Sequence, residues 1–593
     1  MSKSALFWLS LLLLSTLSCT SEPAQDTTTD EDMNTFDQLL ADYQEDRYTY
    51  FPWEATMAGD NRFNDQFPNI LTQAYRDQVT AFFQQYKDQL QAVDRSSLSA
   101  TQQMSYDILM WECNINLETM AFPAQFLPVN QFSAPHLVVG QLASGQSIQP
   151  FQTVEDYDNW LKRVDGFIAW CDTAMVYMRQ GMEQGYTLPA ALTLKTIPQM
   201  ASFTVEPVEE NLFYQPVNNM IADFPAEEKA RISADYRTMV SEQIIPTFRR
   251  FESFMQDEYL PSSRASSGID SVPGGADYYN TLIKMYTTTD LTADEIHELG
   301  LREVARLEAE MEKVKAQVGF EGSLLEFFDH VRERPELMPY DDPQQVIDHF
   351  NAIHERMKPQ LARLFDLVPK TEFEVRRTEA FREASASAEY NQGSQDGSRP
   401  GIFYVPIPNV AEYNIFADED LFLHEAIPGH HYQISLQQED EKLPAFRRSL
   451  WYSAYGEGWA LYCESLGSEL GLYTDPYQYF GMLSAEMHRA IRLVVDTGIH
   501  AKGWTREQAI QYSLEHEAEP EASIIAEIER YMAIPGQALS YKIGQLKILE
   551  LRARAEAAMG DDFDIRTFHR LVLEDGCLPL ALLEKKIDNW IKQ

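Results

Sequence analysis

The chain has 593 residues, of which 44% are hydrophobic and 12% aromatic, enough for a large buried core. Its 48 basic and 91 acidic residues give a formal net charge of −43. Such an acidic surface repels phosphate backbones, so we expect no nucleic-acid partner. Five cysteines in so long a chain are too few for a disulfide scaffold, although one or two bridges would be possible in a periplasm.

Residues 1–18 are predicted to be a lipoprotein signal peptide. Lys3 precedes an apolar run at residues 5–17, and the small Ser18 stands directly before Cys19. This stretch resembles the bacterial lipoprotein signal, in which cleavage leaves the cysteine as a lipid-modified N-terminus. The apolar run is too short to span a membrane. We therefore expect the protein to meet a membrane only through a lipid on Cys19.

The segment that follows, residues 19–45, is polar and acidic, which predicts a flexible tether. Thr20 stands where an aspartate would favour the inner membrane, so the expected location is the outer membrane, facing the periplasm. Residues 46–593 would form the catalytic domain. The Ser-rich segment 261–268 is the best candidate for a boundary inside it.

Most of the domain is predicted to be helical. Helix-forming residues with apolar positions at core-like spacing recur along the chain, at 74–90, 100–117, 226–255, 295–318, 478–501 and 542–559. We expect a mainly α fold, with two helical lobes of about 46–270 and 271–593 that enclose a deep groove.

One short strand is predicted at residues 401–408, directly before the motif described next. Prolines at and near its ends indicate an edge strand. An edge strand can take an extended peptide by strand addition. Tyr404 on the strand and Arg399 in the preceding loop are therefore candidate substrate-binding residues, and a purely structural strand is the alternative.

Three of the chain's 12 histidines lie within eight residues, at His424, His430 and His431. Neutral imidazoles are good ligands for zinc, and the neighbouring Glu425 is placed to act as a general base. The alternative without a metal is a histidine-rich helix end in polar surroundings. We expect Zn²⁺ as the cofactor.

The spacing of these histidines requires a distorted helix. In a regular helix His430 would lie on the wrong side of His424, and His431 would lie on the right side but about 10 Å along the axis. Pro428 removes a backbone N–H, and Gly429 tolerates unusual dihedral angles, so together they can break the helix. We expect the break to return His430 to the metal, and His431 stays open as the alternative ligand.

A second predicted helix supplies the third metal ligand. Glu457 lies 33 residues after His424, and Glu464 follows it by two helical turns on the same face. We expect Glu457 to bind the ion and Glu464 to hold a ligand histidine in place. The alternative for Glu457 is a solvated carboxylate at a helix start.

Polar residues further along form a stripe on another predicted helix, at Arg489, Arg492, Asp496 and His500. Arg492 is expected to bind a substrate carboxylate, and His500 to donate to the scissile carbonyl. A solvated helix face is the alternative. A tyrosine, either Tyr531 or Tyr541, would be a second donor, and we favour Tyr541.

Several motifs together resemble the bacterial domain-of-unknown-function 885 (DUF885) family. They are His-Glu-Ala-Ile-Pro-Gly-His-His at 424–431, Glu-Gly-Trp-Ala-Leu-Tyr at 457–462, Asp-Gly-Ser-Arg-Pro-Gly at 396–401 and Pro-Gly-Gln-Ala at 535–538. The resemblance spans about residues 45–590. The family is similar in architecture to helical zinc peptidases that use a glutamate as third ligand. It implies a helical, gluzincin-like fold and a hydrolase.

The expected function is zinc-dependent hydrolysis of peptide bonds in oligopeptides. His424, His430 and Glu457 would hold the zinc, and Glu425 would act as general base. Hydrolysis of another amide or an ester is one alternative. A non-catalytic lipoprotein that binds a metal or another ligand is a second alternative. The sequence predicts no oligomeric state.

Overall fold

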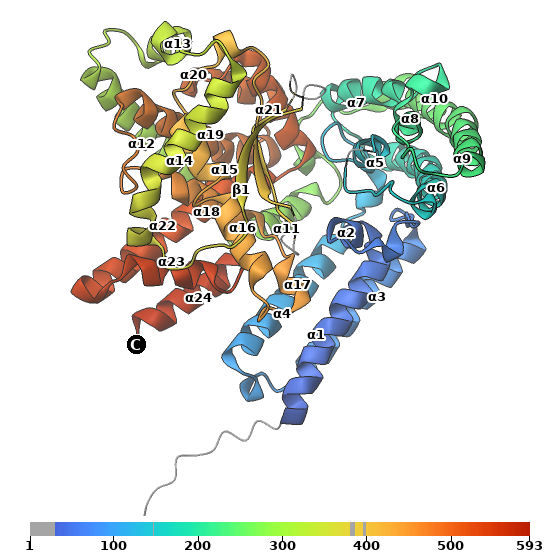
Figure 1. Ribbon diagram of the computed structural model, residues 1–593, viewed down its shortest axis with the longest axis horizontal. Helices are drawn as coiled ribbons and strands as arrows, with labels where there is room; N and C mark the ends of the chain where they lie inside the picture. Colours follow the sequence, from blue (N-terminus) through green and yellow to red (C-terminus); the bar gives the residue numbers. More distant parts are fainter. Residues whose placement is uncertain (1–29, 146, 380–382, 384–385, 395–398, 593) are drawn as a thin grey trace, which may run out of the picture.

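A computed structural model describes residues 30–145, 147–379, 383, 386–394 and 399–592. Helices dominate this part of the chain, with one small sheet, so the predicted mainly α fold is confirmed (Figure 1). The predicted signal peptide, Cys19 and the tether up to residue 29 lie outside the described residues. Among the described helices, none is both long and apolar enough to cross a membrane.

The first helix begins inside the predicted tether. Helix α1 spans Asp30–Tyr50, and Phe36, Leu40 and Tyr43 are buried on one of its faces. Their spacing of four and three residues places them against the core of the molecule. The prediction of a flexible tether up to residue 45 is therefore wrong from α1 onward. Composition favoured a tether because the buried apolar residues are few and lie in an acidic run.

Two hydrophobic cores organise the described chain. The larger one joins α1, α3 (Gln73–Ala92) and α4 (Ala100–Met120) to the C-terminal helices. The smaller one lies mainly between residues 127 and 259. Because α1, α3 and α4 share the larger core, the cores do not follow the predicted division at residue 270.

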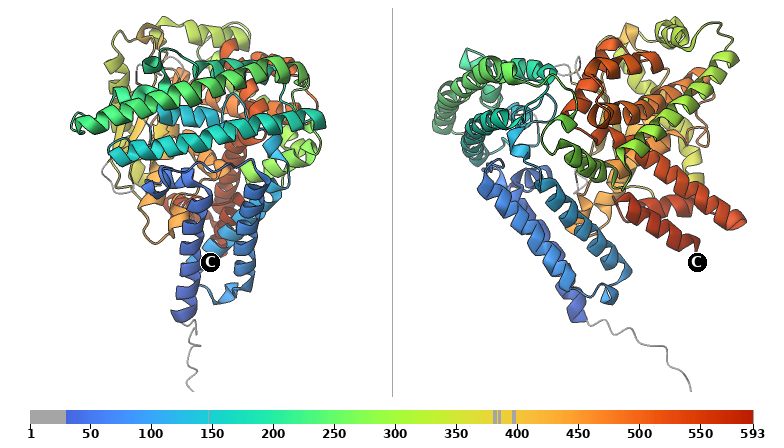
Figure 2. Two further views of the ribbon diagram at one scale, coloured as in Figure 1. Left: turned by 90° about the vertical axis from the view of Figure 1, so that its right-hand side faces the viewer. Right: turned by 180° about the vertical axis from the view of Figure 1, so that it is seen from behind.

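The smaller core is built by long helices that lie side by side. Helix α6 (Val154–Gln184) runs alongside the nearly continuous helical segment formed by α9 (Ala226–Thr238) and α10 (Ile245–Ser253) (Figure 2). Helix α7 (Ala190–Ser202) packs against α10. This layer of helices stands beside the C-terminal half of the chain.

The sheet has three strands in the order β1-β3-β2, with β1 at Phe373–Arg377, β2 at Glu389–Asn391 and β3 at Gly401–Val405. Strand β3 is parallel to β1 and antiparallel to β2. The prediction that residues 401–408 form an edge strand is thus wrong. Four of the five β3 residues are buried, which suits a central strand, and the prolines lie outside its paired residues.

Five helices carry the predicted site: α15 (Asp418–Glu425), α16 (His430–Glu439), α18 (Ser453–Glu464), α19 (Pro476–Ala501) and α22 (Ser540–Met559). Helices α18 and α22 cross at two glycines. A β-carbon on Gly458 would lie 2.4 Å from the Cα atom of Gly544, so neither position has room for a side chain. This close approach sets Glu457 of α18 beside the first turn of α22.

The remaining α-helices complete the two cores. They are α2 (Pro52–Met57), α5 (Pro135–Ala143), α8 (Gln215–Asn218), α11 (Gly275–Thr287), α12 (Ala293–Gln317), α13 (Leu324–Glu333), α14 (Pro343–Leu364), α17 (Ala445–Arg448), α20 (Arg506–His516), α21 (Glu521–Ala533), α23 (Ile565–Leu573) and α24 (Leu580–Ile591).

Candidate metal centre

The predicted helix break is present. Helix α15 ends at Glu425 and α16 begins at His430, so four residues leave the helical path between them. A β-carbon on Gly429 would lie 1.9 Å from the carbonyl oxygen of His424, so only glycine fits this position. The break brings the His424 and His430 rings together, with their centroids 4.8 Å apart.

The break is anchored to the helix that carries the third predicted ligand. The indole Nε1 of Trp459 donates a 2.9 Å hydrogen bond to the carbonyl oxygen of Pro428. Trp459 is fully buried in α18, two residues after Glu457. One helix therefore both fixes the break and presents Glu457 to the histidines.

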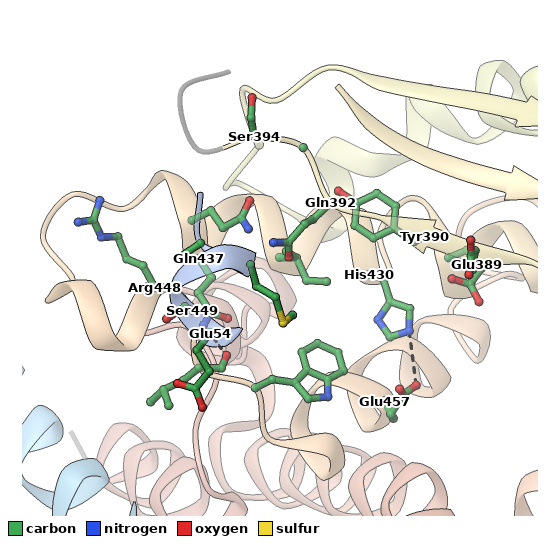
Figure 3. Close-up of a pocket in the computed structure, with 18 of the residues that line it drawn as sticks. Glu54, Glu389, Tyr390, Gln392, Ser394, His430, Gln437, Arg448, Ser449 and Glu457 are labelled. Atoms are coloured by element: carbon green, nitrogen blue, oxygen red, sulfur yellow. Dashed lines mark hydrogen bonds and ion pairs between the residues drawn. The ribbon is translucent and has the colours of Figure 1, made fainter. Parts of the chain in front are cut away.

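The three predicted ligands converge. Donor atoms of His424, His430 and Glu457 all lie within 4.8 Å of one another. The Oε2 atom of Glu457 is 3.4 Å from His430 Nε2, the contact drawn as a dashed line in Figure 3. It is 3.7 Å from His424 Nε2. Ligands about 2.0–2.1 Å from a tetrahedral zinc ion are separated by roughly 3.3 Å, so this donor set fits the implied ion.

The electrostatics of the three side chains also suit a cation. Burial lowers the pKa of His424, but hydrogen bonds to Glu457 and Glu464 outweigh it and raise this pKa to about 10. Burial raises the pKa of Glu457, but the charges of His430 and His424 and hydrogen bonds to both rings lower it overall. The carboxylates thus stabilise positive charge at the position where the zinc would bind.

The alternative ligand, His431, points elsewhere. Its Nδ1 atom is hydrogen-bonded to the hydroxyl of Tyr390 on β2, at 3.0 Å. Among the described residues, the cluster that could hold a metal ion contains His430 and not His431. The geometry thus favours His430, as the helix break predicted.

A buried network behind the metal centre orients His424. The Oε1 atom of Glu464 lies 2.6 Å from His424 Nδ1, and Glu464 is 1% exposed. Burial, and then the negative charge of Glu464, raise the pKa of Asp420. Because Nδ1 is held in this way, Nε2 faces Glu457. The expected role of Glu464 matches this geometry.

Glu425 lies beside the ligands without joining them. Its half-buried side chain lines the same cavity as His424, His430 and Glu457, and it is outside the three-residue cluster. Burial raises its pKa, while the charges of His424 and His430 lower it by less. A carboxylate in this position is free to accept a proton from a water molecule.

A cavity of about 1010 Å³ opens over the centre. Side chains from β2, from the α1–α2 region and from helices α18, α19 and α22 line it. Figure 3 shows Glu54 of α2, Tyr390 of β2 and Glu457 of α18 around it, so segments far apart in the sequence meet there. The predicted residues that line it are His424, Glu425, His430, Glu457, Arg399, Arg492 and Tyr541.

His500 lies away from the cavity, which contradicts its predicted role as a donor to the substrate. Its Nδ1 accepts a 3.0 Å hydrogen bond from the backbone N–H of Ile269, and its Nε2 donates to the carbonyl oxygen of Tyr531, also at 3.0 Å. Burial lowers its pKa to about 3. His500 shares a helix face with Arg489, but 11 residues place it about 16 Å further along the axis.

Tyr404 is also outside the cavity lining. It sits on the central strand β3, paired with Arg376 of β1. Arg399 is exposed and does line the cavity. The edge that reaches the cavity belongs to β2, whose Glu389 and Tyr390 are among the lining residues. Of the described strands, β2 and not β3 is therefore the edge strand that lines the cavity.

Arg492 and Tyr541 are together in the cavity wall. The Arg492 guanidinium lies 4.6 Å from the centroid of the Tyr541 ring. Burial, and then the negative charge of Glu457, raise the pKa of Tyr541, so its hydroxyl stays protonated and able to donate. Tyr531 accepts a hydrogen bond from Arg492 and donates one to Glu527, which leaves Tyr541 as the better donor to a substrate.

Sequence reasoning gave no role to several cavity residues. Trp451 is 43% exposed, and its ring lies 5.8 Å from that of His430. Arg489 was placed on the polar stripe of α19 without a function, and Arg530 lies next to Tyr531. Arg489 and Arg492 are three residues apart, and this spacing was the sequence signal that both share one helix face. No sequence pattern singles out Trp451.

Comparison with known proteins gives a family but no activity. The model of a family described as "Bacterial protein of unknown function (DUF885)" matches residues 52–587. No curated protein matches the chain. A candidate lipoprotein from Colwellia psychrerythraea has a similar crystal structure, with a TM-score of 0.86 and 28% identity over 95% of this chain and 99% of that one.

Two further structures were found. A candidate lipoprotein of unknown function from Shewanella oneidensis has a TM-score of 0.73 and 19% identity, over 93% of this chain and 99% of that one. A candidate oligoendopeptidase F from Bacillus anthracis strain Ames has a TM-score of 0.29 and 13% identity, over 86% and 95% of the two chains. We draw no conclusion from the last.

Proposed function

The chain belongs to the bacterial DUF885 family, whose function is unknown, and we propose that it is a zinc-dependent metallopeptidase acting on oligopeptides. One observation carries the proposal. Donor atoms of His424, His430 and Glu457 meet within 4.8 Å in the wall of a cavity of about 1010 Å³, with Glu425 beside them. A structural metal site needs neither a cavity nor an adjacent carboxylate that is not a ligand.

The chain's own residues divide the chemistry of hydrolysis. Zinc held by the three ligands would supply a Lewis acid and lower the pKa of a water molecule. Glu425 accepts the proton of the attacking water and passes it to the leaving amine. The Tyr541 hydroxyl donates a hydrogen bond to the carbonyl oxygen as negative charge develops on it.

The cavity walls suit extended peptides. Strand β2 is the edge of the sheet on the cavity side, and its Glu389 and Tyr390 line the cavity, so a substrate backbone could pair with it. Arg399 and Arg492 are placed to bind substrate from other walls. Residues of the α1–α2 region line the cavity too, which would exclude folded proteins.

We further propose that the protein is a lipoprotein attached through Cys19 to the outer membrane, facing the periplasm. The lipoprotein-like signal supports this, and the relatives from Colwellia psychrerythraea and Shewanella oneidensis are described as candidate lipoproteins. Cys19→Ala should release the protein into the soluble periplasmic fraction. Equal membrane retention of the variant and the wild type would contradict the anchor.

The test of the activity is hydrolysis of a mixed peptide library by the purified protein. Cleavage should stop when zinc is removed by a chelator and return when zinc is added back. Matched ester and non-peptide amide substrates in the same assay distinguish a peptidase from another hydrolase. Cleavage that continues at full rate after complete removal of metal would contradict the proposal.

A further inference from the structure

We propose that Arg489 and Arg492, supported by Arg530, form a subsite for a carboxylate of the substrate in the wall of this cavity. The inference rests on the proposed peptidase function and adds a substrate class: short peptides that place a carboxylate beyond the scissile bond. All three arginines line the cavity, Arg489 and Arg492 from one face of α19 and Arg530 from α21.

The charge of the cavity wall differs from that of the whole chain. Six arginines and six glutamates line the cavity, whereas the chain carries 48 basic and 91 acidic residues. Two of the glutamates, Glu425 and Glu457, belong to the metal centre. The rest of the wall therefore has two more arginines than glutamates, which favours an anionic group.

Arg489 has no carboxylate within ion-pair distance among the described residues, although its charge lowers the pKa of the nearby Glu425 and Asp420. No described acidic side chain forms an ion pair with it, and its one hydrogen bond runs from Nη1 to the carbonyl oxygen of Ala485, at 3.2 Å. Its Nε atom is buried and has no hydrogen-bond partner in the described part of the chain. An unpaired guanidinium in a cavity wall can pair with a ligand anion.

Arg492 has an unused donor in a more buried place. The residue is 7% exposed, its Nε donates to Tyr531 at 2.9 Å, and its Nη2 donates to Glu527 at 3.0 Å. The Nη1 atom is buried and has no partner among the described residues. A buried donor left unpaired is costly, so a carboxylate that reached it would recover that cost.

Two of the three guanidinium groups, those of Arg492 and Arg530, share one carboxylate. Glu527 accepts from Arg492 at 3.0 Å and from Arg530 at 2.7 Å. Arg489 has no ion pair, so the cluster keeps an excess of positive charge. A ligand carboxylate with two oxygens would complete it, because guanidinium groups bind carboxylates in a bidentate manner.

The cluster lies close to the proposed reaction site. Tyr541 connects the two: its ring is 4.6 Å from the Arg492 guanidinium, and it stands in the first turn of α22, beside Glu457 of α18. The arginines and the metal centre line one cavity, so a short peptide held at the metal centre would place its end near these arginines. The C-terminal carboxylate of a short peptide would fit, as would an acidic side chain at that position.

Three matched peptides distinguish these sources. The first two have the same neutral sequence and end as a free acid or as an amide. The third is an amide in which glutamate replaces the last residue. Wild-type protein should cleave the free acid with a kcat/KM at least about tenfold above that of the neutral amide. A rate for the glutamate amide equal to that of the free acid would show that the subsite accepts either carboxylate. Equal rates for all three peptides would overturn the subsite.

Arg489→Gln should abolish the preference for the carboxylate, whereas Arg489→Lys should keep part of it. Arg489 has no ion pair, so this change puts the fold at less risk than Arg492→Gln. Arg249→Gln, an exposed arginine outside the cavity, is the control and should keep the full preference. A preference unchanged in Arg489→Gln would overturn the role of Arg489.

Binding separates failure of the subsite from failure of the proposed function. Calorimetry with the zinc-loaded Glu425→Gln protein should show tighter binding of the free acid than of the amide. Equal binding of the two peptides would overturn the subsite, even if zinc-dependent hydrolysis stands. Selective binding by a wild-type protein that cleaves no peptide would overturn the peptidase function and leave the subsite in place.

Discussion

Glu464→Gln should weaken zinc binding although Glu464 is not a ligand. Its Oε1 atom lies 2.6 Å from His424 Nδ1, and the residue is 1% exposed. Glutamine keeps the shape of the side chain but loses its charge. The His424 ring would then be less basic and less firmly oriented toward Glu457.

The size of the effect follows from the geometry. Loss of a residue that holds a ligand histidine typically lowers metal affinity 10–100-fold, about 1.4–2.7 kcal/mol. Hydrogen bonds to charged groups contribute about 1.5–3 kcal/mol, which is the same range. The pair is short and shielded from solvent, so we expect roughly 30–100-fold weaker binding.

The assay is competition for zinc against a chelating dye, together with melting temperatures with and without zinc. The stabilisation by zinc should shrink by the same free energy. Glu469→Gln is the control, because Glu469 is an exposed residue in the turn after α18 that pairs with Arg552 at 3.0 Å. Wild-type zinc affinity in the Glu464→Gln protein would refute the role assigned to this network.

Three further predictions test other parts of the structure. His430→Ala should lose bound zinc and His431→Ala should retain it; the reverse zinc contents would contradict the ligand assignment. Gly458→Ala should destabilise the fold by about 1–3 kcal/mol and reduce turnover, because its β-carbon would overlap Gly544; an unchanged melting temperature would contradict the helix crossing. The depressed pKa of His500, about 3 against an ordinary 6.5, gives stability that is complete above pH 6.5 and is lost as pH falls toward 3. The melting temperature of His500→Gln should therefore fall less between pH 7.5 and 5 than that of the wild type, and an equal fall would contradict this.

Parts of the candidate metal centre could be predicted because their determinants are local, although the packing of α18 that brings Glu457 to the histidines is not. Pro428 and Gly429 lie between the two histidines, so the need for a helix break follows from covalent chemistry and spacing alone. Glu457 and Glu464 are seven residues apart, and two helical turns place both on one face. These facts do not depend on how distant parts of the chain pack.

The errors arose where packing between distant segments decides the outcome. Periodicity placed Arg489, Arg492 and His500 on one face of α19, but it does not say which neighbour each meets along the axis. His500 meets Ile269 and the backbone of Tyr531 instead of the cavity. The helix face that these residues share was predictable, but which of them would reach the cavity along the helix axis was not.

The sheet shows the same limit. Whether β3 is central or at the edge depends on β2, which has only three residues, too few for an alternating pattern. In α1, three buried apolar residues lie in a run rich in acidic and polar side chains, and composition alone predicts a tether. Only contact with the rest of the core reveals the helix as part of the fold.

The most direct test of the central claim is a paired measurement of zinc stoichiometry and peptide turnover for Glu425→Gln and Glu457→Gln. Glu425→Gln should keep its zinc and its fold while turnover falls by at least about two orders of magnitude, because the proton acceptor is gone. Glu457→Gln should lose zinc, because it removes a ligand. A Glu425→Gln protein that binds zinc and turns over peptide at the wild-type rate would contradict the proposed mechanism.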